Sequence, residues 1–266
     1  LPSSQVFAYT QKGLWCWSNA GFIYDRVNDE VTVIDVLVDA KQTQLLVDEI
    51  RRVAPSSAKF KNLIYTHCDI DHWGGQQVAY DLFETVYAAG SGCERAMREW
   101  SQGHEAALRS IAIGHYLWET IGSSLVETLA STSLTSRVLQ FSPRIAESLV
   151  AVLAKLNAAE LFAPFEFDKM SFEKERYPTY LVQGRETIQV GNADVHLIPM
   201  GVPSHSDHDL VVHIPEAKTV FAGDILFNSV TPVVWAGTFE DCQAALAALD
   251  DIPGTPARAL LSRNPF

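Results

Sequence analysis

The chain has 266 residues, of which 47% are hydrophobic and 20% are charged, which is the balance of an ordinary globular protein. Its formal net charge of -12 repels phosphate backbones, so we expect no nucleic-acid partner. The sequence contains no run of about 18 apolar residues, the length that a membrane span needs, so we expect no membrane partner either.

The N-terminal part alternates between strand and helix patterns. Residues 6–38 form a β-rich stretch in which turn residues separate three runs of apolar side chains. Residues 41–53 carry apolar side chains at helical spacing, and residues 62–66 predict a short buried strand. A helical pattern follows at 74–83 and another short strand at 85–89. This alternation predicts a layered α/β protein.

The middle of the chain has a different pattern from its two ends. From about residue 92, Gly and Pro become few and apolar residues recur at helical spacing, so we expect a helical insertion at about 92–176. We place this insertion within a single domain that spans residues 1–266. Beyond Tyr180 the strand pattern returns, and a final helix is predicted at 239–249. The strands expected between them are 187–190, 195–200, 210–214 and 219–227.

The cysteines show no pattern of a zinc site or of a disulfide framework. They are widely spaced, and a chain of this length needs no disulfide staples. The first residues, Leu1-Pro2-Ser3, show no signal-peptide pattern. We therefore expect a cytoplasmic protein with free thiols at Cys16, Cys68, Cys93 and Cys242.

A cluster of potential metal ligands follows the strand at 62–66. The segment from His67 to His72 holds two histidines and two aspartates in six residues. Alternate residues of an extended strand end point to one side, so His67, Asp69 and Asp71 are expected to converge, and His72 follows where a helix begins. Imidazole nitrogen and carboxylate oxygen both suit zinc, iron and manganese. The alternative role, Asp71 as a helix cap, accounts for one aspartate and leaves both histidines unexplained.

The segment T-H-C-D-I-D-H-W-G-G resembles the H-x-H-x-D-H metal motif of the metallo-β-lactamase superfamily, with Asp69 in the second histidine position. Other segments resemble that family in the same order, at 18–23, 33–35, 203–215 and 220–227. The resemblance implies a four-layer αββα sandwich of the metallo-β-lactamase type. It also implies two metal positions: one formed by His67, Asp69 and His205, the other by Asp71, His72 and Asp224, with Asp224 bridging them.

Two features depart from the family pattern. Asp69 is a harder, anionic ligand than histidine, and it shifts the relative preference toward iron or manganese. No histidine follows Asp224, so the last histidine ligand of the family is missing and its replacement stays open. We expect one or two divalent metal ions, with zinc first and iron or manganese as alternatives.

Further aromatic and histidine residues are candidates for substrate binding. Trp15, Trp17 and Trp73 flank the motifs, and each either lines a pocket or fills the core. His208 lies three residues after His205, and His115 lies in the expected insertion. For both histidines the alternative is an ordinary surface or structural role.

The resemblance and the ligand set together predict a metal-dependent hydrolase. A bound divalent cation acidifies water and polarises carbonyl groups, so we expect cleavage of an ester, thioester, lactone or lactam bond in a small molecule. Asp71 is the expected catalytic residue, which orients the water or binds the second metal. One alternative is an iron-dependent oxidoreductase or oxygenase, because family members with two irons show an H-x-E-x-D-H pattern. Another is a metal-poor binding protein without catalysis.

The insertion carries two further expectations. It lies in the sequence between the first metal motif and His205, so we expect it to border the mouth of the active site. Its apolar helix faces are also a candidate homodimer interface.

Overall fold

The computed structural model describes residues 4–11, 18–103, 177–227, 232–253 and 259–260. The chain divides into two units, one of residues 1–102 and 170–266 and one of residues 103–169. Apart from Gly103, the second unit lies outside the described residues. So do the part of the predicted insertion beyond residue 103, His115, Trp15, Trp17 and Cys16.

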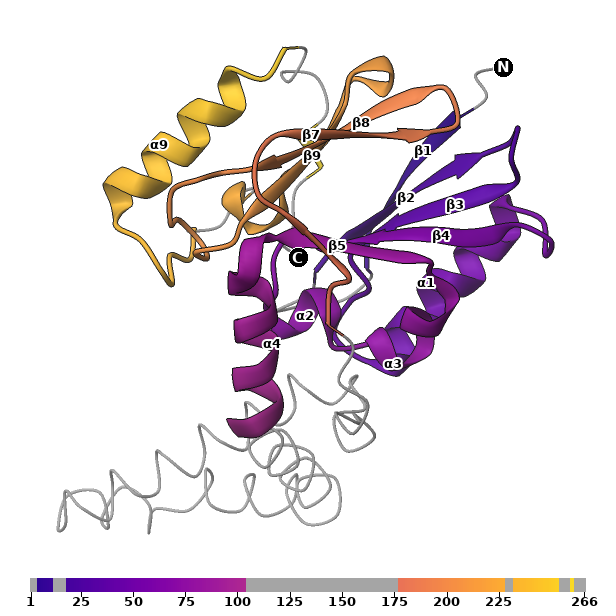
Figure 1. Cartoon of the computed structure of the whole chain (residues 1–266), viewed down its shortest axis with the longest axis horizontal. Coiled ribbons are helices and arrows are strands. Elements are labelled where there is room, and N and C mark those ends of the chain that lie inside the picture. The colour runs from indigo at the N-terminus through magenta and orange to yellow at the C-terminus, as the bar shows by residue number, and fades with distance from the viewer. Residues whose placement is uncertain (1–3, 12–17, 104–176, 228–231, 254–258, 261–266) are drawn as a thin grey trace, which may run out of the picture. The chain divides into compact units, whose positions relative to one another are not determined.

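Two β-sheets form the centre of the first unit (Figure 1). The first sheet begins with three antiparallel strands, and its other three strands continue in parallel from the third. In the second sheet four strands are antiparallel, and the C-terminal strand is parallel to its neighbour. The first sheet has the order β1 (Ser4–Tyr9), β2 (Ala20–Asp25), β3 (Glu30–Ile34), β4 (Lys59–Ile64), β5 (Thr85–Ala89) and β6 (Tyr180–Val182). The second has the order β11 (Ala259–Leu260), β10 (Thr219–Phe221), β9 (Leu210–Ile214), β8 (Ala193–Pro199) and β7 (Glu186–Val190).

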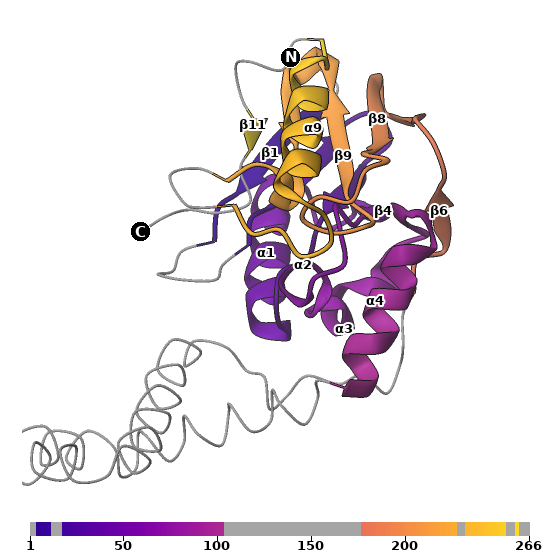
Figure 2. The ribbon, with the colours of Figure 1, turned by 90° about the vertical axis from the view of Figure 1, so that its left-hand side faces the viewer.

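Helices lie on the outer faces of both sheets (Figures 1 and 2). Side chains cap two of the longer helices at their N-termini. Asp39 caps the helix that begins at Ala40, and Thr238 and Asp241 form a capping box at the helix that begins at Phe239. The first sheet carries α1 (Ala40–Val53), α2 (Ile70–Trp73), α3 (Gln76–Ala79), η1 (Tyr80–Leu82) and α4 (Gly90–Gly103). The second carries α9 (Phe239–Asp250), and the short turns η4 (Pro215–Ala217) and η5 (Gly223–Ile225) follow β9 and β10.

Three hydrophobic clusters separate these layers. The first lies between the first sheet and its helices and includes Leu46 of α1 and Met97 of α4. The second lies between the sheets, where Ile64 of β4 and Val195 of β8 are fully buried. The third lies beneath α9 and includes Ala245. The layers run helix, sheet, sheet, helix, which confirms the predicted αββα sandwich.

The predicted elements differ from the observed ones mainly at their ends. The helix expected at 74–83 is divided into α3 and the 3-10 turn η1. The strand expected at 219–227 ends at Phe221, because the chain turns at Gly223 into η5. The short strands β6 and β11 were not predicted, since three and two residues give too little periodicity to detect.

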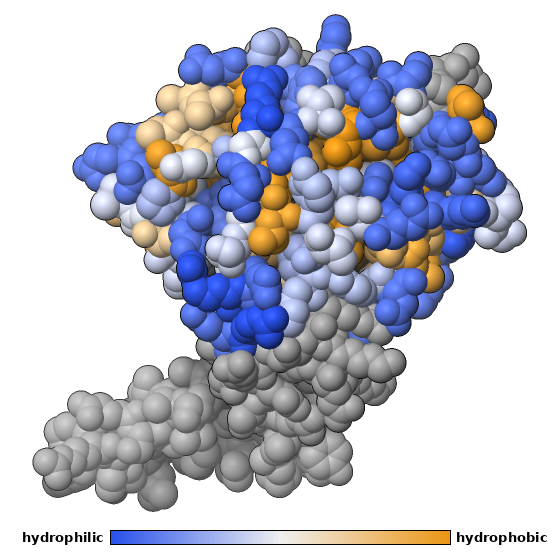
Figure 3. All heavy atoms as spheres, in the orientation of Figure 1, coloured by the Kyte–Doolittle hydropathy of each residue, from blue (hydrophilic) through white to orange (hydrophobic). Residues whose placement is uncertain are grey.

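The face shown in Figure 3 is mostly hydrophilic over the described part, with small apolar groups between the polar side chains. Among the described residues, no helix is both long and apolar enough to cross a bilayer.

Candidate metal centre

Side chains from both sheets meet where β4 and β9 approach each other. The loop after β4 contributes His67 and Asp69, and α2 contributes His72. The loop before β9 contributes His205. The backbone N–H of Leu210, the first residue of β9, donates to the Thr66 carbonyl at 2.7 Å and so joins the two segments.

The predicted first set of ligands is together in the structure. One ligand atom each from His67, Asp69 and His205 lies within 4.8 Å of the others. Asp69 Oδ2 is 3.0 Å from His205 Nε2 and 3.7 Å from His67 Nε2. Asp69 occupies the N-cap position of α2, but its side chain makes no capping hydrogen bond. Its carboxylate therefore faces the histidines and not the helix end.

A second group of ligand atoms consists of His67, His72 and Asp224, again within 4.8 Å of one another. Asp224 Oδ1 lies 3.2 Å from His72 Nε2, and Asp224 Oδ2 lies 3.6 Å from His205 Nε2. One carboxylate thus lies between the two groups, which is the bridging position implied by the resemblance. The predicted second set consists of Asp71, His72 and Asp224, and Asp71 borders this group with its Oδ2 3.8 Å from His72 Nε2.

Asp35, at the end of β3, orients His72. Its backbone is left-handed, with φ of 60°, and its buried carboxylate accepts from Thr66 N at 2.8 Å and Thr66 Oγ1 at 2.7 Å. The same carboxylate lies 2.9 Å from His72 Nδ1. Because the carboxylate accepts, Nδ1 carries the hydrogen and the lone pair of Nε2 faces the cluster.

The other two histidines are oriented in the same way. Thr66 Oγ1 donates its hydrogen to Asp35, so at its 3.3 Å contact with His67 Nδ1 it accepts from the ring. The backbone carbonyl of Val233 accepts from His205 Nδ1 at 2.8 Å. In the neutral form, all three rings therefore direct a free Nε2 lone pair into the cluster.

Gly223 allows Asp224 to reach this position. Its φ of 54° is in the left-handed region, and a Cβ at residue 223 would lie 2.8 Å from Thr66 Oγ1. Glycine avoids both the strained conformation and the close contact. The backbone can therefore approach Thr66, and the next residue enters the cluster.

Several buried polar atoms in this cluster have no hydrogen-bond partner among the described residues. They are His67 Nε2, His72 Nε2 and Asp224 Oδ1. A buried polar atom without a partner typically costs about 1–3 kcal/mol, so three at one point are unusual. When His72 is neutral, all three offer lone pairs that suit a divalent cation, whereas a protonated His72 would pair its Nε2 with Asp224 Oδ1, 3.2 Å away. The residues present therefore fit a bound metal ion.

The three histidines of the cluster have widely different pKa values when no metal is bound. Burial lowers the pKa of His67 to about 4, with a further lowering from His72. Burial also acts to lower the pKa of His205, but its hydrogen bond with Asp69 and the charge of Asp224 raise that pKa to about 9. The pKa of His72 is raised well above its usual value, because Asp35 and its other carboxylate neighbours outweigh burial. Without a metal, protons on His72 and His205 thus balance the carboxylates at neutral pH.

The carboxylates respond to the same charges. Burial acts to raise the pKa of Asp69, but the hydrogen bond with His205 and the nearby histidines lower it to about 2. The pKa of Asp224 is shifted downward too, because the charge of His72 outweighs burial. Burial raises the pKa of Asp71 to about 6. Two carboxylates are therefore firmly ionised and available to a cation, whereas Asp71 can hold a proton near neutral pH.

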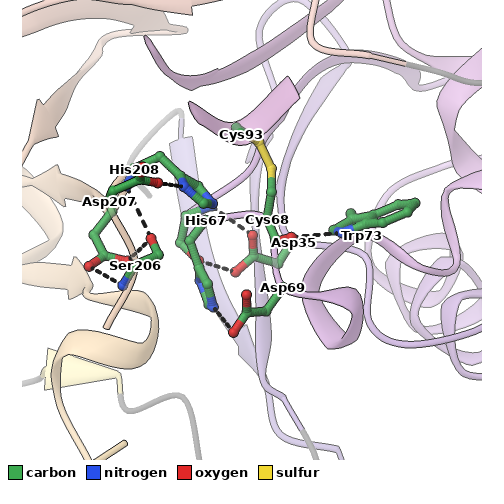
Figure 4. Close-up of a disulfide and its surroundings, with 11 residues drawn as sticks. Asp35, His67, Cys68, Asp69, Trp73, Cys93, Ser206, Asp207 and His208 are labelled. Carbon is green, nitrogen blue, oxygen red and sulfur yellow. Dashed lines mark hydrogen bonds and ion pairs between the residues drawn. A yellow bond between two sulfur atoms is a disulfide. The ribbon is translucent and has the colours of Figure 1, made fainter. Parts of the chain in front are cut away.

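A disulfide joins Cys68, inside the metal motif, to Cys93 in α4 (Figure 4). Their Cα atoms are 5.1 Å apart. The prediction of free thiols is wrong for this pair, because wide spacing in sequence does not prevent contact in the fold. Cys242 is free and buried. Disulfides are rare in reducing compartments, so cysteine usage no longer supports the cytoplasmic expectation.

The substrate-binding candidates have different environments. Trp73 is buried in the first cluster, with Nε1 donating to the Cys68 carbonyl at 2.9 Å, and points away from His67 (Figure 4). Of the two alternatives, the structure selects core filling for this residue. His208 is buried too, and its Nδ1 lies 2.6 Å from Asp207 Oδ1. Neither side chain lies exposed at the cluster.

Sequence reasoning missed the groups that orient the ligands. Asp35 lies in the segment at 33–35 that resembles the family, but its residue type and position alone predict no role. The carbonyl of Val233 belongs to the backbone and has no signature in residue type. Thr66 had a detectable signal, since it directly precedes His67 at the end of β4.

Comparisons with known proteins agree with this fold. A family model of the metallo-beta-lactamase superfamily matches residues 151–262. The search of curated proteins finds no significant match. The stereoselective inverting sec-alkylsulfatase Pisa1 from Pseudomonas sp. aligns over 93% of this chain and 35% of its own, with 16% identity and a TM-score of 0.56. This chain thus spans about a third of the length of that sulfatase.

Two other solved structures align over more of their own length. A metallo-beta-lactamase family protein from Thermus thermophilus covers 99% of this chain and 74% of its own, with 16% identity and a TM-score of 0.57. The B3 metallo-beta-lactamase BLEG-1 covers 98% and 92%, with 15% identity and a TM-score of 0.56. The predicted resemblance is confirmed: the chain has the fold of the metallo-β-lactamase superfamily, and residues 151–262 carry the sequence pattern of that superfamily.

Proposed function

We propose that this protein is a metal-dependent hydrolase that cleaves an ester, thioester, lactone or lactam bond in a small molecule. The observation that carries the proposal is the convergence of three histidine Nε2 atoms with the carboxylates of Asp69 and Asp224. The names of the similar structures, a sulfatase and a β-lactamase, support hydrolysis as the class of reaction.

The ligand sets define two candidate positions for divalent cations. His67, Asp69 and His205 would hold one ion. His72 and Asp224 would hold a second, together with His67 or with Asp71, which borders them. A bound divalent cation supplies an acidified water and a polarised carbonyl at neutral pH.

The residues at the open side of the cluster would position the water and the substrate. The Asp69 side chain is 29% exposed and that of Asp71 is 16% exposed, whereas the Asp224 side chain is only 4% exposed. The substrate would therefore approach past Asp69 and Asp71. The Ser18 hydroxyl donates to the Asp71 carbonyl and anchors this residue. Asp71 would accept a hydrogen bond from the attacking water and hold its proton.

One observation favours a second candidate, an iron-dependent oxidoreductase. Asp69 places a carboxylate oxygen where the family usually has a histidine, and harder ligands move relative preference toward iron or manganese. Zinc remains the first candidate because its intrinsic affinity exceeds that of both metals.

The test combines metal analysis with a substrate screen. The protein is grown with zinc, iron and manganese available, its metal content is measured, and ester, thioester, lactone and lactam compounds are assayed. Zinc with turnover supports the hydrolase, and iron with oxygen consumption supports the oxidoreductase. A protein that binds none of the three metals and cleaves no compound contradicts both.

Two variants make the test specific. Asp71→Asn should keep the ion held by His67, Asp69 and His205 and lower kcat by about 100-fold or more, which is the usual contribution of a positioned acid or base. His67→Ala should lose metal and activity together, since His67 belongs to both ligand groups. His196→Ala is the matched control, because it removes a histidine of β8 outside both groups and should leave metal content and rate unchanged.

A further inference from the structure

An exposed tryptophan borders the cluster beside His205. The Trp235 side chain is 72% exposed, and its ring centroid is 6.5 Å from that of His205. The ring of Phe227, which is partly buried, lies 5.9 Å from the His205 ring. One candidate ligand is therefore next to two aromatic rings, and one of these rings is open to solvent.

The backbone around Trp235 is tied to the same histidine. The Trp235 N–H donates to the His205 carbonyl at 3.1 Å, and the Val233 carbonyl accepts from the His205 ring at 2.8 Å. Two residues further on, Gly237 packs so closely that a Cβ there would lie 2.0 Å from the Pro203 carbonyl oxygen. These three contacts hold the segment against the His205 loop, so the position of Trp235 follows that of the cluster.

The exposure of Trp235 has no structural explanation in the layered core. Tryptophan is highly buried on average, and binding sites commonly combine aromatic side chains with a few polar groups, as Trp235 and the candidate ligands do here. Phe239 is exposed to a similar extent, 73%, at the start of α9. It makes no aromatic contact with His205 among those found in the described residues, and so it serves as a comparison residue.

We propose that Trp235 determines substrate specificity by packing against an aryl group next to the bond that is cleaved. This inference rests on the proposed hydrolase function and names its substrate class: esters or related acyl compounds whose acyl part is aromatic. A flat, exposed tryptophan face favours offset stacking with an aromatic ring, and its contact with the buried His205 places that face next to a candidate ligand. The carboxyl end of such a substrate would then point toward Asp69 and the other ligands.

The experiment measures binding separately from turnover. Naphthoate, the product of an aromatic acyl ester, is titrated calorimetrically into zinc-loaded protein, with acetate as the small counterpart. Trp235→Ala should weaken naphthoate binding about 5- to 10-fold, the effect of one aromatic pair, and leave acetate binding unchanged. Trp235→Phe should retain most of the affinity. Phe239→Ala should bind both ligands like the wild type.

The outcomes separate this inference from the proposed function. Equal naphthoate affinity in wild type and Trp235→Ala, or no naphthoate binding by the wild type, overturns the role of Trp235. A change in oligomeric state without a change in naphthoate affinity overturns it as well, because Trp235 would then serve a contact between copies. If naphthoate binding depends on Trp235 but no ester, thioester, lactone or lactam in the screen is hydrolysed, aryl compounds included, the hydrolase proposal fails and the binding surface stands. If both proposals hold, Trp235→Ala lowers kcat/KM for methyl naphthoate and not for methyl acetate.

Discussion

Asp35→Asn is the substitution that tests most directly how the ligand histidines are oriented. The carboxylate of Asp35 accepts three hydrogen bonds, from Thr66 N, Thr66 Oγ1 and His72 Nδ1. In asparagine the oxygen can keep the bond from Thr66 N, but an NH2 group replaces the oxygen that faces Thr66 Oγ1 and His72. That group donates to His72 Nδ1 and moves the ring hydrogen to Nε2. The nitrogen that should face a cation then carries a hydrogen.

The size of the effect follows from these contacts. Hydrogen bonds to a charged group contribute about 1.5–3 kcal/mol each and neutral ones about 0.5–1.5 kcal/mol. Losing the bond from Thr66 Oγ1 and replacing the charged contact with His72 by a neutral one lowers the free energy of unfolding by about 2–5 kcal/mol. Reorientation of Thr66 recovers some of this loss, so for metal-free protein we expect a decrease in the free energy of unfolding at the lower end of this range. Loss of a group that orients a metal ligand typically weakens metal affinity about 10- to 100-fold.

The assay needs a control for the backbone, because Asp35 is left-handed with φ of 60°. Asp29 has φ of 57° and accepts hydrogen bonds from Tyr24 at 2.9 Å and Ser57 at 2.6 Å, with no contact to the cluster. Asp29→Asn therefore makes the same chemical change in the same backbone conformation. Zinc affinity is measured by competition with a chromophoric chelator, and stability is measured by denaturant unfolding of metal-free protein.

Equal zinc affinity in wild type and Asp35→Asn would refute the reasoning about tautomers. A loss of affinity of the same size in Asp29→Asn would show that the backbone conformation, and not the contact with His72, is responsible.

Three further predictions concern the same cluster, and a fourth concerns the disulfide between Cys68 and Cys93. His205→Ala should abolish binding at the first position without unfolding the β core, as elemental analysis and circular dichroism will show; full occupancy would contradict its role as ligand. The pKa of His205 is about 9 without metal, so the ring is protonated at pH 7 and zinc binding should release that proton. The proton release should vanish as the pH rises through about 9, and calorimetry in buffers of different ionisation enthalpy measures the number of protons released. Asp69→His should increase zinc occupancy relative to iron and manganese, and identical metal ratios in both proteins would dismiss the effect of the carboxylate. Replacing Cys68 and Cys93 by serine should lower the free energy of unfolding by about 3 kcal/mol, as expected for a loop closed over 25 residues; unchanged stability would show that the bond does not form.

Local patterns in the sequence were sufficient for most of the secondary structure and for the identity of the candidate ligands. The helix at α1 and the strands at β2, β4 and β9 follow from apolar periodicity, which depends only on near neighbours. His67, Asp69 and His72 stand within one short motif, and His205 and Asp224 were found because their segments resemble the family in the same chain order.

The tertiary structure decided which of these groups meet and how each one is oriented. Asp69 and His205 are 136 residues apart in the sequence, and only the packing of the two sheets brings their side chains within 3.0 Å. The grouping of His67 with His72 and Asp224, with Asp71 at its border, depends on side-chain directions that no spacing rule specifies.

The same distinction explains the tryptophans and the cysteines. Trp73 and Trp235 are the same residue type beside candidate ligands, yet one is 1% exposed and the other 72%. Cys68 and Cys93 form a bond because a loop and a helix pack together, which their spacing does not reveal. Residue type and local periodicity are properties of a few neighbouring positions, so the sequence carries them directly. Exposure, pairing and convergence depend on segments distant along the chain, and only the folded layers bring those segments together.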